Sequence, residues 1–124
     1  MKKILCILLT LLFCLSLISC GTNSAKPTNT KEFSYLPTYS STMKLQSFTP
    51  TTQAGQEFGT AKYTVDNSMS ADVLQKYEEI LKKDGWSLYE DHKPYSIGVE
   101  KGTHYASIVP QQSGKDVILT VISK

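Results

Sequence analysis

Arginine is absent from this chain of 124 residues, and its three cysteines all lie within the first twenty positions. Arginine is the residue best suited to bidentate contacts with phosphate and guanine. Beyond residue 20 the chain can form neither a disulfide nor a thiolate metal site. The formal net charge of +2 comes from Lys2 and Lys3, so the rest is neutral. We therefore expect no nucleic-acid partner and a domain that folds by packing alone.

Motifs of common catalytic and metal sites are missing as well. The sequence contains no Gly-x-Ser-x-Gly elbow, no His-Glu-x-x-His pair and no glycine-rich phosphate loop. His92 lies among Glu90, Asp91 and Lys93, but no second histidine or cysteine stands at ligand spacing. This pattern is typical of a solvated turn. The sequence predicts no catalytic residue, no metal site and no cofactor.

The N-terminal residues predict that the protein is exported from the cytoplasm. Lys2 and Lys3 precede an uncharged, apolar run over residues 4–18. As a helix this run would span roughly 22 Å, which is less than the ~30 Å hydrocarbon layer of a bilayer. An export signal is therefore favoured over a stable membrane span.

The end of this run resembles the lipobox of bacterial lipoproteins, in the residues Leu17-Ile18-Ser19-Cys20. The resemblance implies that residues 1–19 are a signal peptide, cut between Ser19 and Cys20, and that Cys20 carries acyl chains such as palmitate. At ~0.8 kcal/mol per buried methylene, two chains give stable anchoring. The expected location is the outer face of the cell membrane, or the outer membrane in a cell that has one.

Residues 20–42 are expected to be a tether, because serine, threonine, asparagine, lysine and proline dominate them. Four apolar residues in the range 33–39 are unusual for a linker. Two interpretations stay open: this part docks on the domain as an irregular arm or edge strand, or it is a flexible tether. Residues 43–124 are expected to form one small domain.

A helix over about residues 70–84 is the best-specified element. Ser70 is a candidate N-cap, and Val73, Leu74, Tyr77, Ile80 and Leu81 form one apolar stripe. Glu78 with Lys82 and Glu79 with Lys83 are expected as ion pairs on the solvated face. Gly85 predicts a left-handed stop, with Trp86 packed on Leu81 in a Schellman motif.

Strands are expected on both sides of this helix. Met43, Leu45 and Phe48 indicate one that ends at Pro50, and Ala61, Tyr63 and Val65 alternate with polar residues in a second. After the helix, further strands are expected near residues 86–89, 95–100, 104–109 and 116–123, with a turn over 110–115. Short loops favour antiparallel hairpins. The predicted fold class is α+β, with one helix on a four- to six-stranded antiparallel sheet in the order ββαβββ or ββαββββ.

The helix segment resembles those of many small bacterial lipoprotein domains of unassigned function. The matching positions are Asp72-Val73-Leu74, Tyr77, Leu81 and Asp84-Gly85-Trp86. This resemblance covers about 15 residues and implies an architecture only.

The sequence predicts a non-catalytic binding or interaction module at the cell envelope. In the last strand Val117, Leu119 and Val121 point one way, whereas Ile118 and Ile122 point the other. Either the first strand or the arm covers these isoleucines, or they form an exposed strip that binds a protein partner or a second copy of the chain.

Two alternatives belong to other classes. A small hydrolase would need His104, a serine and an aspartate that meet only in the fold. A carbohydrate-binding module would use Trp86 and the tyrosines as a stacking platform. Strand and helix parity places Trp86, Tyr63 and Tyr77 toward the core, which argues against that platform.

Overall fold

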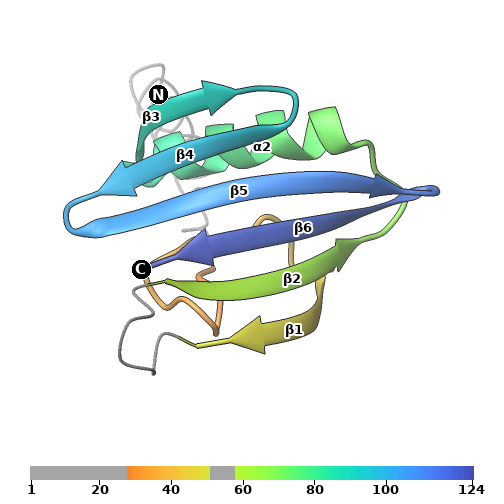
Figure 1. Cartoon of the computed structure of the whole chain (residues 1–124), viewed down its shortest axis with the longest axis horizontal. Helices are drawn as coiled ribbons and strands as arrows, with labels where there is room; N and C mark the ends of the chain where they lie inside the picture. Colours follow the sequence, from red (N-terminus) through yellow and green to blue (C-terminus); the bar gives the residue numbers. More distant parts are fainter. Residues whose placement is uncertain (1–27, 51–57) are drawn as a thin grey trace, which may run out of the picture.

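The computed structural model describes residues 28–50 and 58–124. Within these ranges one helix packs against a six-stranded antiparallel sheet (Figure 1), so the predicted α+β class is confirmed. The elements are β1 (Lys44–Thr49), β2 (Gly59–Val65), α2 (Ser70–Lys83), β3 (Ser87–His92), β4 (Ser96–Lys101), β5 (His104–Ser113) and β6 (Asp116–Ser123). None of this part of the chain forms a helix long and apolar enough to cross a bilayer.

The sheet is built around β6, which lies between β2 and β5 in the order β1-β2-β6-β5-β4-β3. Alternation sends Val117, Leu119 and Val121 of β6 into the core, where each is fully buried. They pair directly with the buried residues of β2: Val65 with Val117, Tyr63 with Leu119, and Ala61 with Val121. These cross-strand apolar pairs fix the register, because a slip of one residue would turn the apolar set outward.

Helix α2 covers one part of this core face. Val73, Leu74, Tyr77 and Leu81 of its stripe are fully buried. The helix ends as predicted: Gly85 has φ 91°, the Gly85 N–H donates to the carbonyl of Lys82, and the Trp86 N–H donates to that of Leu81. This is the Schellman arrangement, and it turns the Trp86 ring into the core.

The start of the helix differs from the prediction. Ser70 is the first helical residue, its cap position is Met69, and no side chain of the cap residue accepts a hydrogen bond. Instead the Ser70 N–H donates to Oε1 of Gln112, at 2.9 Å. A residue from β5 thus satisfies one of the free amides of the first turn, which removes the need for a local capping side chain.

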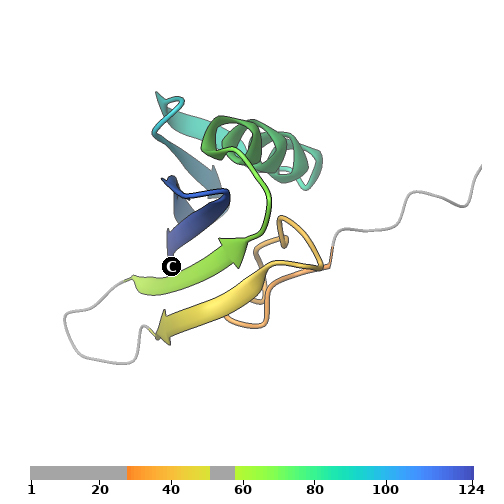
Figure 2. The ribbon, with the colours of Figure 1, turned by 90° about the vertical axis from the view of Figure 1, so that its right-hand side faces the viewer.

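The arm over residues 28–43 covers the rest of the core face (Figure 2). Phe33 and Leu36 are buried, and the Leu36 carbonyl accepts a hydrogen bond from the N–H of Thr30. For residues 28–42, docking is the interpretation found, and residues 20–27 of the expected tether lie outside the described residues. The arm lies on the side of Leu119, where Glu32 accepts a hydrogen bond from the Tyr63 hydroxyl, and β1 is an edge strand. Of the two interpretations of Ile118 and Ile122, the one in which the arm or the first strand covers them was therefore wrong.

Strand β5 is longer than predicted, because Pro110 lies inside it and pairs with Leu119. Pairing with β4 ends at Ile97 and Ile108. Beyond Ile108 the strand has a neighbour on one side only, so the missing N–H of a proline need not break a ladder. The turn comes later, at Gly114, which has φ 61°.

Candidate functional site

The sheet face opposite α2 and the arm carries the strip predicted from the sequence. Ile118 and Ile122 lie on this open face, and both are half-buried. Ile122 pairs with Thr60 on one side and Ser107 on the other, while Ile118 pairs with Thr64 and Gln111. Val109 lies diagonally between the two isoleucines, opposite Thr120. We call Ile118, Ile122 and Val109 the open-face strip.

The surroundings of the strip are mostly hydroxyl groups. Its direct cross-strand neighbours include Thr60, Thr64, Ser107 and Thr120. Such side chains supply both donors and acceptors without adding charge. The open face is thus an apolar strip within a hydrogen-bonding border that includes one lysine, Lys62, opposite Thr120, a composition that suits contact with another surface.

Aromatic rings gather at one end of the same face. Tyr89 and Tyr105 meet edge to face at 6.0 Å between centroids, and the Lys124 ammonium lies 4.6 Å from the centre of the Phe58 ring and 5.6 Å from that of Tyr105. Gly98 makes this packing possible, because a Cβ there would come within 2.7 Å of the Tyr89 ring. Sequence reasoning grouped Tyr89 and Tyr105 with the other tyrosines and missed Phe58, although its parity with Thr60 was a usable signal.

The stacking platform of Trp86 and the tyrosines, which the carbohydrate-binding alternative requires, is not formed as a whole. Trp86, Tyr63 and Tyr77 are buried, as parity predicted. Burial raises the pKa of the Tyr77 hydroxyl above its ordinary value. The pKa of Tyr63 is raised by burial and by the nearby Glu32 carboxylate, which accepts a hydrogen bond from the Tyr63 hydroxyl at 2.9 Å. Both phenols therefore act as structural donors.

The edges of the sheet are poor sites for strand addition. Both edge strands change register, β1 between Leu45 and Ser47 and β3 between Leu88 and Glu90. Such irregularities twist an edge away from a partner, and charged side chains such as that of Lys44 do the same. The open face is therefore the better candidate for protein contact.

His104 lies at a second candidate location, a hollow of about 600 Å³. Its ring stacks on Tyr35 at 3.7 Å, and its Nδ1 lies 3.2 Å from the carbonyl oxygen of Lys124. The Asp84 carboxylate also lines this hollow, where it accepts the Trp86 indole N–H at 3.2 Å. The hydrolase alternative requires a serine beside His104 and Asp84. None of the described residues that line the hollow is a serine.

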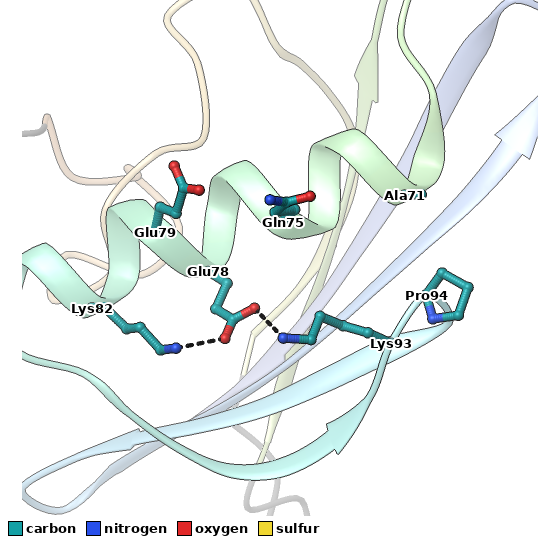
Figure 3. Close-up of a pocket in the computed structure, with 7 residues that line it drawn as sticks. All are labelled: Ala71, Gln75, Glu78, Glu79, Lys82, Lys93 and Pro94. Carbon is teal, nitrogen blue, oxygen red and sulfur yellow. Dashed lines mark hydrogen bonds and ion pairs between the residues drawn. The ribbon is translucent and has the colours of Figure 1, made fainter.

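A cluster of charges joins α2 to the hairpin of β3 and β4 (Figure 3). Glu78 is only 5% exposed. One of its carboxylate oxygens accepts a hydrogen bond from Nζ of Lys82 and the other from Nζ of Lys93, each at 2.7 Å. Hydrogen bonds from Lys82 and then Lys93 hold the pKa of Glu78 below its ordinary value. Glu78 was predicted on the solvated face. It is buried because the hairpin folds over that side of the helix and brings Lys93 to it.

The other charged residues of this region are exposed. Glu79 points away from the cluster (Figure 3). His92 lies 3.3 Å from Oε1 of Glu90. Across the described residues no three side chains of histidine, cysteine, aspartate or glutamate come together as a metal site would require. The Glu78 cluster satisfies its own charges, and we assign it a structural role.

A second hollow, of about 310 Å³, lies beside the arm. Met43, Leu45 and Tyr63 line it, together with hydroxyl and amide groups of the arm and the side chains of Lys31 and Glu32. Thr28, the first described residue, is also part of its wall. We call it the arm-side hollow.

The remaining predicted site residues, Ser19 and Cys20, lie outside the described residues. Comparisons of the chain with protein-family models, with curated proteins and with solved structures found no match.

Proposed function

We propose that this protein is an exported lipoprotein, held at the membrane by acyl chains on Cys20, whose domain is a non-catalytic interaction module of the cell envelope. The lipid anchor is supported by the order of features at the N-terminus: two lysines, a short apolar run and Leu17-Ile18-Ser19-Cys20. The folded part follows closely, since the arm is already packed on the domain at Thr30.

The interaction surface is the open face, and one observation carries this assignment. Ile118 and Ile122 belong to the central strand, yet neither the helix nor the arm covers them, and they stay half-buried. An apolar strip of this kind on an exported domain is a docking surface for a protein partner or for a second copy of the chain.

The test is capture of partners by the acylated protein in its native membrane, through chemical cross-linking and identification of the cross-linked chains. We expect the variant Ile118→Lys with Ile122→Lys to lose the partners that the wild type captures. Cross-links of the chain to itself would identify the partner as a second copy. Lys76→Glu, on the exposed side of the helix, is the matched control and should keep them. An unchanged set of cross-links in the double variant would contradict the assignment.

A second candidate rests on the aromatic end of the open face, where the exposed rings of Phe58 and Tyr89 flank Tyr105. Sugar rings stack on such surfaces through their C–H faces, and the neighbouring hydroxyl groups can bond sugar hydroxyls. Tyr89→Ala with Phe58→Ala should then abolish retention on polysaccharide columns that hold the wild type. If no polysaccharide retains the wild type, this candidate is rejected.

A further inference from the structure

The arm-side hollow lies close to the proposed point of anchoring. Thr28 forms part of its wall, and Cys20 lies eight residues earlier in the chain. A fully extended chain spans at most ~3.3–3.6 Å per residue, so this link is no longer than roughly 29 Å. If it behaves as a coil, its root-mean-square length is only about 14–17 Å. This step rests on the proposed function, since it takes Cys20 to be in the membrane.

The side chains around the hollow suit the surface of a bilayer. Leu45 is 48% exposed and lines the hollow, and Phe48, further along β1, is 38% exposed. The hollow is also lined by Lys31, by Glu32, whose carboxylate is bonded to the Tyr63 hydroxyl, and by hydroxyl and amide groups such as those of Asn29 and Ser40. Apolar side chains beside lysine and hydroxyl groups match the boundary between acyl chains and phosphate headgroups, where each group finds its own environment.

We infer that the arm-side hollow, with Leu45 and Phe48 beside it, rests on the phospholipid surface that holds Cys20. The opposite orientation would require the chain to run from Thr28 around the edge of the domain to the open face. With layers packed about 10 Å apart, a path past both the arm and the sheet covers roughly 20 Å. That distance is most of the roughly 29 Å that the fully extended link can span. The short link therefore favours the arm side, and the open-face strip is turned away from the membrane toward partners.

The test measures which side of the acylated protein meets lipid. In the processed protein Cys20 is blocked by its thioether, so a new cysteine takes a fluorescent thiol label alone. Leu45→Cys reports on the arm side, and Lys62→Cys, an exposed residue of the open face, is the matched control. Each labelled protein is placed in vesicles of phosphatidylcholine and phosphatidylglycerol with brominated acyl chains, which quench the label on contact.

We expect bromine to quench the Leu45→Cys label at least about twofold more than the Lys62→Cys label, because only the arm side meets lipid. Equal quenching, or stronger quenching at position 62, would overturn the inference. Quenching at position 45 that depends on protein density and not on bromine would assign the hollow to a second copy, and would overturn it too.

Mass spectrometry of the N-terminal peptide separates this inference from the proposed function. If Cys20 is acylated and the two labels are quenched equally, the orientation is wrong while the anchor stands. If Cys20 carries no acyl chain, the anchor is wrong and the orientation argument is overturned with it.

Discussion

The hydroxyl of Tyr77 donates a hydrogen bond to the backbone carbonyl of Pro37 at 2.6 Å, and both residues are fully buried. Forty positions separate them, so this bond forms only when the arm lies against the helix. A second bond between the hydroxyls of Tyr35 and Ser123, at 2.9 Å, fastens the arm to β6. The arm is therefore a layer of the fold, and the link between Cys20 and the folded part is short.

Removal of the Tyr77 hydroxyl should loosen the arm. In Tyr77→Phe the ring still fills the core, but the Pro37 carbonyl is left buried without its donor, at a cost of roughly 1–3 kcal/mol. Chemical denaturation measures the cost, and hydrogen exchange should rise within residues 30–39. Tyr95→Phe is the control, because that residue is exposed and its change should stay within about 0.5 kcal/mol. If Tyr77→Phe matches this control, the arm does not depend on the bond.

Acid should destabilise the domain through Glu78. Its pKa is lowered in the folded state, mainly by Lys82 and then by Lys93. The carboxylate therefore contributes stability that is fully present above its ordinary pKa of about 4.3 and is lost as pH falls through the lower native value. We expect Glu78→Gln to reduce stability by roughly 1–3 kcal/mol near neutral pH. The same variant should be less sensitive to acid than the wild type.

Urea denaturation at about pH 7 and about pH 3 tests this pH dependence. Glu79→Gln is the neighbouring control, since Glu79 is exposed and points away from the cluster. It should keep the acid sensitivity of the wild type. If Glu78→Gln is as acid-sensitive as this control, the low pKa of Glu78 is not what drives acid unfolding.

The two faces of β6 should respond differently to the same charge. Ile118→Lys with Ile122→Lys should stay folded, because half-buried positions allow a lysine to extend its ammonium group into water. Leu119→Lys should unfold the domain, because Leu119 is fully buried between them and the charge would have no partner. Circular dichroism distinguishes the two outcomes. Unfolding of the open-face variant would show that something covers the strip.

Local signals predicted much of the fold. Gly85 and Trp86 specified the helix end because every bond of a Schellman motif joins residues within five positions. Alternation in β2 and β6 identified the two faces of the sheet, and it singled out Ile118 and Ile122. It could not say which face the arm covers, since a period of two is the same for both.

The contacts that sequence reasoning missed join distant residues. Gln112 reaches Ser70 across 42 positions, and Lys93 reaches Glu78 only after the hairpin of β3 and β4 has folded back over the helix. The role of Pro110 depends on where β4 ends, which no property of Pro110 reveals. These contacts and the tolerance of Pro110 depend on how the assembled sheet brings distant residues together.

The lipid anchor is tested most directly by metabolic labelling with an alkyne analogue of palmitate, for the wild type and for Cys20→Ser. The wild type should take up the label and lose its first nineteen residues, because a thiol at position 20 is the acyl acceptor. Cys20→Ser should take up none and keep its signal peptide. Cys14→Ser, inside the apolar run, is the control and should be labelled like the wild type. Undiminished labelling of Cys20→Ser would contradict the anchor.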